Sequence, residues 1–151
     1  MENLLISACL LGVECKYSGG SNALPAETIG KLRARYRLIP VCPETAGGLP
    51  TPRDPSERIG ERVVSCRGAD VTQQFKKGAQ AALLLAKRYG CTKALMKEHS
   101  PSCGSGLIYD GSFSGKLVEG DGCAAELLKA AGVSVVGENV TELLTMVCKA
   151  E

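Results

Sequence analysis

The chain has 151 residues, of which 44% are apolar and 23% are charged, so its composition is that of a folded globular protein and excludes a disordered chain. The formal net charge is only +2, no block of one sign occurs, and aromatic residues make up 4% with no tryptophan. These values argue against a polyanion-binding surface or a platform for stacked bases, and we expect no DNA partner. We also expect no membrane association and a cytoplasmic location, because no apolar run is long enough for a membrane helix and the N-terminus lacks the features of a signal peptide.

The predicted elements alternate between strands and helices along the chain. The first half contains a short apolar strand, an amphipathic helix opened by a proline, a second strand, and a long loop with four of the seven prolines; these cover residues 4–10, about 25–35, 37–41 and 42–58. A loop of this length inside a compact domain is typical of a functional element.

The second half repeats the alternation. It contains the longest helix, a third strand, a polar loop, a hairpin around Gly111, a helix, a fourth strand and a closing helix; these cover residues 70–88, 92–97, 98–106, 107–117, 121–131, 133–136 and 138–148. Such alternation predicts an α/β fold, a single Rossmann-like three-layer domain over residues 1–151 with a mostly parallel sheet and a small hairpin. Open sheets of this kind bind ligands at the carboxyl ends of their strands.

Cysteine is the unusual component of the sequence. The eight cysteines occupy positions 9, 15, 42, 66, 91, 103, 123 and 148. Cytosolic thiols stay reduced, so metal binding or thiol chemistry is expected for some of these residues, and burial as small hydrophobic residues for the rest. There is no CxxC pair, so neither a zinc ribbon nor a ferredoxin motif is present.

Three of the cysteines lie where a parallel sheet would bring them together. Cys9 closes the first predicted strand, Cys42 directly follows the second, and Cys103 lies in the loop after the third. Three convergent thiolates suit a soft metal centre, either zinc or an iron–sulfur cluster, while packing in the core is the alternative for each of them. Cys15 lies in the first loop, near the predicted site, and Cys91, Cys123 and Cys148 are expected to be packing residues.

Polar groups accompany two of these thiols. Glu44 follows Cys42 by two residues, and Ser100 and Ser102 precede Cys103 by three and one. A carboxylate and hydroxyls at the end of an apolar strand are candidates for proton transfer. The alternative is that the surrounding prolines and glycines only shape turns.

The order of the motifs resembles the thiouracil desulfidase family, long known as a domain of unknown function. The matching segments, from about residue 4 to 138, are Ser7-Ala8-Cys9-Leu10-Leu11-Gly12, Cys42-Pro43-Glu44 with Gly47-Gly48-Leu49-Pro50-Thr51-Pro52-Arg53, Asp70-Val71-Thr72, Lys97 with Ser100-Pro101-Ser102-Cys103-Gly104, and Tyr109-Asp110-Gly111 with Phe113-Ser114-Gly115. The resemblance implies a small α/β protein that removes sulfur from thiopyrimidine bases or nucleotides, such as 2-thiouracil and 4-thiouridine monophosphate, and releases sulfide without net redox change.

The same resemblance implies the cofactor and the residues of the site. It implies a [4Fe-4S] cluster held by Cys9, Cys42 and Cys103, with the fourth iron open. Glu44 corresponds to the acid–base carboxylate and Ser100 to the active-site hydroxyl. The further candidates for substrate binding are Arg53, Ser102 and Gly104. For Arg53, pairing with a substrate phosphate and anchoring the proline-rich loop are both consistent with the sequence.

Two other function classes remain open from the sequence. One is a zinc- or cluster-binding protein without catalysis, such as a sulfide or redox sensor. The other is a thiol enzyme that uses one of the three cysteines as a nucleophile or persulfide carrier. His99, the only histidine, is expected to be a packing or surface residue.

Overall fold

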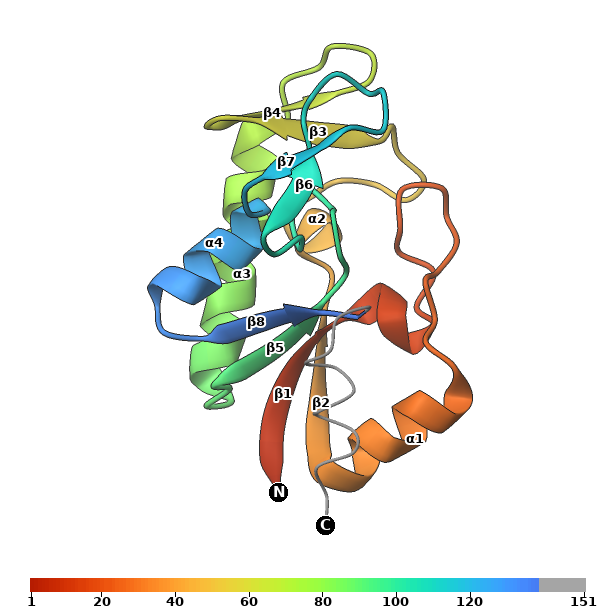
Figure 1. Cartoon of the computed structure of the whole chain (residues 1–151), viewed down its shortest axis with the longest axis vertical. Helices are drawn as coiled ribbons and strands as arrows, with labels where there is room; N and C mark the ends of the chain where they lie inside the picture. The colour runs from red at the N-terminus through yellow and green to blue at the C-terminus, as the bar shows by residue number, and fades with distance from the viewer. Residues whose placement is uncertain (139–151) are drawn as a thin grey trace.

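A four-stranded parallel sheet forms the centre of the computed structural model, which describes residues 1–138 (Figure 1). The strand order is β2-β1-β5-β8, with bounds Tyr36–Val41, Glu2–Ser7, Lys93–Met96 and Ser134–Gly137. Leu5 of β1 is in register with Ile39 on one side and Ala94 on the other. β1 is apolar at consecutive positions because helices cover both faces of the sheet.

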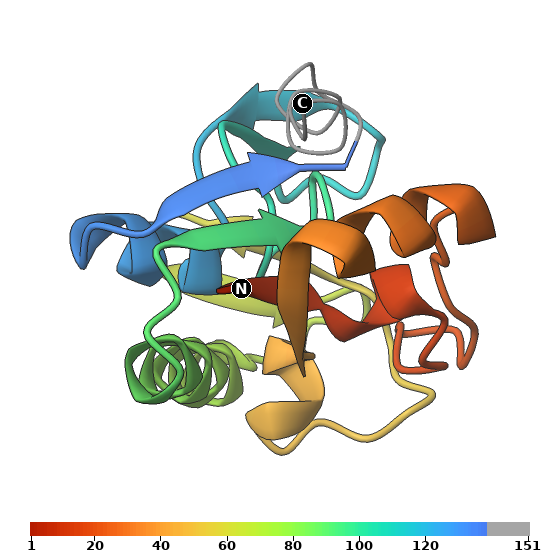
Figure 2. The ribbon, with the colours of Figure 1, turned by 90° about the horizontal axis from the view of Figure 1, so that it is seen from below.

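The helices form a layer on each side of this sheet (Figure 2). On one face, Leu4 and Ile6 of β1 pack in a core cluster with Leu32 of α1 (Ala26–Arg35). On the other face, Leu5 packs in a cluster with Ala82 of α3 (Thr72–Arg88) and residues of α4 (Cys123–Ala130). The predicted three-layer α/β fold with a mostly parallel sheet is therefore confirmed. None of the helices within residues 1–138 has the length and apolar character needed to span a membrane.

Two antiparallel hairpins lie together beyond the carboxyl end of the sheet (Figure 1). One is formed by β3 (Ser56–Ile59) and β4 (Arg62–Ser65), the other by β6 (Leu107–Tyr109) and β7 (Leu117–Glu119). The β3–β4 hairpin is absent from the sequence prediction, which ends its long loop at residue 58. Its turn is the two-residue Gly60-Glu61 connection, with Gly60 at φ 58°, and this Gly-X pair is the local signal that identifies it.

Three further boundaries differ from the sequence prediction. The first strand ends at Ser7 rather than residue 10, because the chain turns into the 3₁₀ helix η1 (Ala8–Leu11), which is closed by Gly12 at φ 95°. The predicted long loop contains a one-turn helix, α2 (Pro43–Ala46), with proline at its first position. The second hairpin has a seven-residue loop, 110–116, between the paired residues Tyr109 and Leu117. The N–H of Asp110 donates to the carbonyl of Lys116 across this loop.

Glycine permits the close contact between α2 and α3. A Cβ on Gly78 of α3 would lie 1.9 Å from the carbonyl oxygen of Pro43, and one on Gly47 would lie 2.0 Å from that of Gln74. This contact fixes α2, and with it the residues that follow β2. The predicted closing helix, 138–148, and Cys148 lie outside the described residues.

Candidate active site

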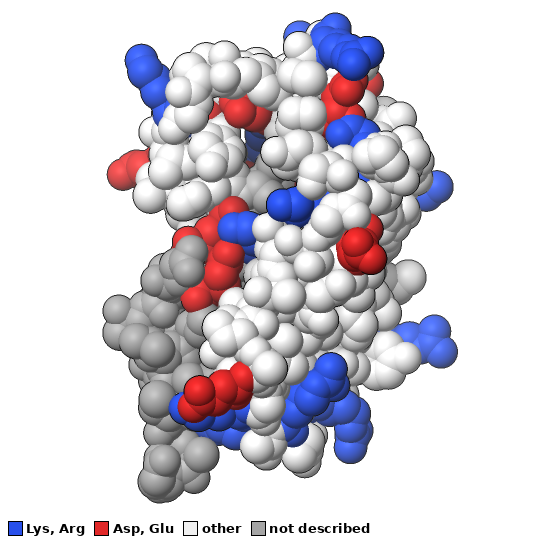
Figure 3. Space-filling model, turned by 90° about the vertical axis from the view of Figure 1, so that its right-hand side faces the viewer, with Lys and Arg blue, Asp and Glu red and all other residues white. Residues whose placement is uncertain are grey.

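A cavity of about 520 Å³ lies at the carboxyl end of the sheet. The residues that line it come from the ends of β1, β2 and β5 and from both hairpins, and they include Ser7, Val41, Lys97, Glu57 and Phe113. The site is therefore at the edge where parallel sheets bind ligands. Charged side chains of both signs are interspersed on the face drawn in Figure 3.

The three predicted cysteines all line this cavity. Cys9 is in η1, rather than in the strand itself, and Cys42 is the residue that precedes the first turn of α2. Cys103 is in the loop after β5, whose carbonyls at Pro101 and Ser102 accept hydrogen bonds from the first N–H groups of α4 at 2.8 to 3.1 Å. The fold thus brings together thiols that are far apart in the sequence.

Burial raises the pKa of two of these thiols, Cys9 and Cys103. Burial raises the pKa of Cys9 and the neighbouring Cys42 adds to the rise, although a hydrogen bond with Asn22 opposes it. Burial raises the pKa of Cys103 to about 12, with opposing hydrogen bonds from Ser7 and Ser102 and further rises from Glu44 and Cys9. A thiol enzyme requires the opposite shift at its reactive cysteine, because the thiolate is the nucleophile, so these shifts disfavour Cys9 and Cys103 in that role.

Cys15 is a fourth thiol in the same cavity. It is only 7% exposed, and burial followed by the neighbouring Cys42 raises its pKa to about 12. The Cys42 thiol donates to the carbonyl oxygen of Cys15 at 3.8 Å. The structure therefore joins Cys15 to the three predicted ligands.

Glu44 is one of the carboxylates that line the cavity, and both of its oxygens accept hydrogen bonds. Arg53 donates from Nε to Oε1 at 3.0 Å in an ion pair whose side chains are 6% and 16% exposed. Ser102 donates to Oε2 at 2.9 Å. Ser102 is also 3.3 Å from the hydroxyl of Ser100, which accepts from the N–H of Cys103 at 2.7 Å. These contacts connect Glu44, Ser102 and Ser100 in one hydrogen-bonded chain beside a thiol.

Arg53 is an anchor in this structure. Besides Glu44, it donates to the carbonyls of Pro50 and Cys15 and to the hydroxyl of Thr51, at 2.9 to 3.1 Å. The guanidinium therefore ties the proline-rich loop to the loop of Cys15 and holds the Glu44 carboxylate.

Gly104, unlike the other predicted site residues, is not among the residues that line the cavity. A Cβ there would lie 2.8 Å from Ile108 and 2.9 Å from the carbonyl oxygen of Ser100. Its structural role is close packing under the loop of Cys103.

The donor set fits a cluster better than a single ion. Within residues 1–138, no three His, Cys, Asp or Glu side chains are grouped closely enough to hold one metal ion. A zinc ion with Zn–S bonds of about 2.3 Å requires its sulfurs within about 4 Å of one another. An iron–sulfur cluster is larger than an ion and is held by thiolates spread around a wider space, as in a cavity lined by Cys9, Cys42 and Cys103.

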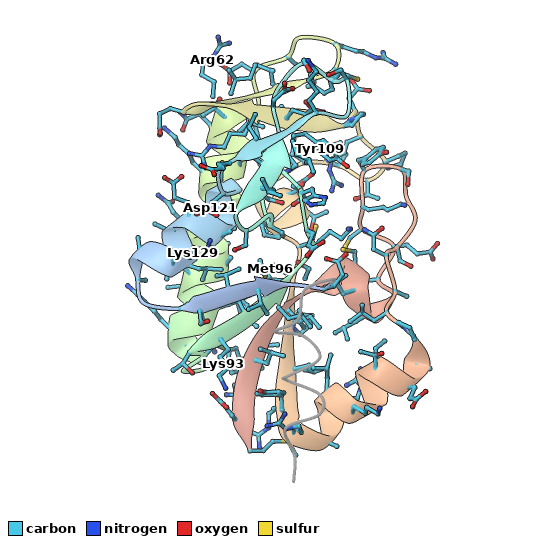
Figure 4. All side chains as sticks on the ribbon, viewed as in Figure 1. Arg62, Lys93, Met96, Tyr109, Asp121 and Lys129 are labelled. Atoms are coloured by element: carbon cyan, nitrogen blue, oxygen red, sulfur yellow. The ribbon has the colours of Figure 1, made fainter. Side chains whose placement is uncertain are left out.

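Several cavity residues were not expected from the sequence. Glu57 comes from the unpredicted β3–β4 hairpin, and His99, expected to be a packing or surface residue, lines the cavity with Tyr109 and Phe113. The ring of His99 makes an edge contact with Tyr109, labelled in Figure 4, at 6.0 Å between centroids. Glu57 could have been placed at the site only if the β3–β4 hairpin had been predicted from the sequence.

Comparison with known proteins identifies the group to which this fold and site belong. A family model described as 2-thiouracil desulfurase matches residues 4–140. The chain belongs to the 2-thiouracil desulfurase family. The resemblance drawn from the motifs is therefore confirmed.

Two relatives are similar to this desulfurase-family chain over most or all of its length. The solved structure of the [4Fe-4S]-dependent thiouracil desulfidase TudS is 44% identical, with a TM-score of 0.91 over 100% of both chains. The uncharacterized protein YbbK of Bacillus subtilis (strain 168) is 43% identical over 146 residues, which cover 90% of this chain and 95% of that protein. The match to TudS extends over the whole fold described above.

Proposed function

We propose that this protein removes sulfur from thiopyrimidines, 2-thiouracil and 4-thiouridine monophosphate, by hydrolysis of C=S to C=O in the cytoplasm. The proposal includes a [4Fe-4S] cluster held by Cys9, Cys42 and Cys103, with one iron free of protein ligands. When bound, such a cluster supplies a Lewis-acidic iron for the soft thione sulfur. Family membership and the likeness to TudS support the reaction class.

The observation that carries the proposal is the position of Glu44. Its carboxylate lies in a cavity with three thiols and is held by Arg53 and Ser102 through separate oxygens. A carboxylate fixed in this way can accept a proton from a water molecule that attacks the thiocarbonyl carbon. The C–S bond then breaks as the new C–OH becomes C=O, and the hydroxyl proton together with the proton held by Glu44 leaves with the sulfur as hydrogen sulfide.

The two serines assist Glu44 in this proposal. Ser102 is 2% exposed and donates to Glu44, so it orients the carboxylate. The hydroxyl of Ser100 lies 3.3 Å from that of Ser102 and can pass a proton along the chain or orient the water molecule. Arg53 holds the Glu44 carboxylate in place through the ion pair at 3.0 Å.

The test is sulfide release by anaerobically reconstituted protein. With 2-thiouracil or 4-thiouridine monophosphate as substrate, we expect free sulfide in proportion to the loss of thiocarbonyl absorbance. A protein with a full cluster that releases sulfide from neither compound would refute the proposal and favour a cluster-binding protein without catalysis.

A further inference from the structure

Two aromatic residues in the site have an unusual backbone conformation. Within residues 1–138, the non-glycine residues with positive φ are His99 at 68° and Phe113 at 56°, and both line the cavity. Bulky side chains rarely adopt this conformation, because Cβ crowds the neighbouring carbonyl oxygen. Such strain persists only where the surrounding structure holds it, and it is concentrated at functional sites.

Glu57 holds the strained loop of Phe113. Its Oε1 accepts the N–H of Gly111 at 2.9 Å and the N–H of Phe113 at 3.0 Å. Glu57 belongs to β3 and is 9% exposed, so a buried carboxylate of one hairpin clamps the loop of the other. A carboxylate oxygen that accepts two backbone N–H groups fixes the loop at two points.

The loop is also fixed from within. Oδ1 of Asp110 accepts from both the N–H and the hydroxyl of Ser112, at 2.9 and 2.6 Å. Gly111 has φ 97°, and a Cβ there would lie 2.2 Å from Ile59, so the loop rests directly on β3. The position of Phe113 is therefore set by the clamp and by the turn that precedes it.

Packing does not account for Phe113. The residue is 38% exposed and belongs to neither of the two core clusters. The cavity is nevertheless rich in rings: four of the chain's seven Tyr, Phe and His side chains line it, namely Tyr17, His99, Tyr109 and Phe113. A strained, clamped and partly exposed ring beside a cavity is arranged to contact a ligand.

We propose that Phe113 stacks on the pyrimidine ring of the substrate and that Glu57 is the positioning residue that sets the backbone of Phe113. This inference rests on the proposed function, because it names how that site selects a flat ring. The site would therefore favour planar thiopyrimidines over small thiones without a ring, such as thioacetamide.

The test measures the binding of uracil, the product analogue, to reconstituted protein by calorimetry. Because a stacked base contributes about 1–3 kcal/mol, Phe113→Ala should weaken uracil binding about five- to 150-fold. Phe113→Gly should weaken it equally without lowering the thermal unfolding midpoint, because glycine relieves the strain at positive φ. A purely structural Phe113 predicts a lower midpoint instead.

The clamp is tested by a conservative pair with a matched control. Glu57→Ala should also weaken uracil binding and raise KM more than it lowers kcat, whereas Glu57→Gln keeps an acceptor oxygen and should stay within about three-fold of the wild type. Leu117→Ala removes an exposed apolar side chain from the same hairpin, outside the cavity, and should leave binding unchanged.

The outcomes separate this inference from the proposed function. Wild-type protein that does not bind uracil, or Phe113 variants that bind within two-fold of it, would overturn the stacking role even if sulfide is released. Loss of uracil binding in both Phe113 variants would support stacking even if no thiopyrimidine is desulfurated. Phe113-dependent binding that persists in Glu57→Ala would overturn the role of Glu57 alone.

Discussion

Glu44 acquires its position from a single turn of helix. Cys42 follows β2 and precedes Pro43, which opens α2, so Glu44 lies two residues after Cys42 in the first turn of the helix. Each oxygen has its own donor, Arg53 on Oε1 and Ser102 on Oε2. A carboxylate with both oxygens held in a fixed orientation is suited to act as a general base.

Replacing this carboxylate separates catalysis from cluster binding. Glu44→Gln keeps the shape and a hydrogen-bonding oxygen but removes the proton acceptor, so the kcat for sulfide release from 2-thiouracil should fall about 10²–10⁴-fold. Visible absorbance of the reconstituted protein should remain, because no cysteine is altered. Sulfide release within ten-fold of the wild type, with the cluster retained, would remove Glu44 from the proton transfer.

At the scale of elements, the contact between α2 and α3 positions both Cys42 and Glu44. The two helices touch through glycine, and a methyl group on Gly78 would lie 1.9 Å from the carbonyl oxygen of Pro43. Helix propensity alone favours alanine over glycine by about 1 kcal/mol inside a helix. At Gly78 the steric clash with Pro43 costs more than this gain in helix propensity, so alanine destabilises the fold.

Two glycine-to-alanine variants test this difference. Gly78→Ala should lower the free energy of unfolding by about 3 kcal/mol, because overpacking must displace α2, and cluster retention should fall with it. Gly30→Ala in α1, where a Cβ meets nothing within 4 Å, should raise it by about 0.5–1 kcal/mol. Urea unfolding of the metal-free proteins measures both; equal effects would show that α2 does not depend on this contact.

The loop of Cys103 is tied to α4 through Asp121. Oδ1 of Asp121 accepts from the N–H of Gly106 and from Lys129, both at 2.8 Å; Asp121 and Lys129 are labelled in Figure 4. Partial burial works to raise the pKa of Asp121, but the hydrogen bonds from Lys129 and Gly106 outweigh burial and hold the pKa below its usual value. A lowered pKa means that the ionised form stabilises the fold.

The sign of the pH dependence follows from this shift. The contribution of Asp121 is present above the unfolded pKa of about 3.9 and is lost as the pH falls through the lower folded value. Asp121→Asn should therefore cost about 1 kcal/mol at pH 7, and less as the pH approaches 3. Urea unfolding at both pH values gives the difference. Glu27→Gln, in an exposed ion pair with Lys31, is the control and should change stability little at either pH. A cost for Asp121→Asn that is the same at pH 3 would contradict the assignment.

The elements that could be predicted from the sequence are those with strong local patterns. Apolar runs placed the four sheet strands to within three residues, and helical periodicity placed α1 and α3 almost to their ends. The β3–β4 hairpin has no such pattern, because only Glu57, Val63 and Ser65 of its eight strand residues are buried, and two of these are polar. Its apolar signal is weak because it packs against another hairpin and not into the main core.

The residues of the site also differ in how well the sequence predicts their position. Residues at the carboxyl ends of predicted strands, Cys9, Cys42 and Cys103, could be brought together by topology alone. The contacts of Arg53 depend on the path of the proline-rich loop, and the clamp of Glu57 depends on a hairpin with no strong sequence pattern. Long-range loop contacts of this kind are set by the tertiary fold, which local sequence patterns do not encode.

At the scale of the whole molecule, the cavity lies between the carboxyl end of the sheet, the proline-rich loop and the two hairpins. The segments that follow β1, β2 and β5 supply three thiols, the proline-rich loop supplies Arg53, and the two hairpins close the other side with Glu57 and Phe113. Cys15 also lines the cavity, and it lies in a loop outside the strands and helices. Its carbonyl oxygen accepts a hydrogen bond from the Cys42 thiol. Four thiols in one cavity pose a question of ligand choice, because a fourth thiolate would close the iron position that the proposed reaction requires open.

Cysteine-to-serine variants resolve this choice. Replacing Cys9, Cys42 or Cys103 should abolish the brown colour and the broad absorbance near ~400 nm after anaerobic reconstitution, since in the proposed site each supplies one thiolate to the cluster. Cys15→Ser should retain both the absorbance and sulfide release, because Cys15 is not a ligand in the proposed site. Cys66→Ser, at an exposed thiol outside the cavity, is the matched control. If Cys15→Ser instead loses the cluster while Cys9→Ser or Cys103→Ser retains it, Cys15 belongs to the ligand set and the open iron must lie elsewhere in the cavity.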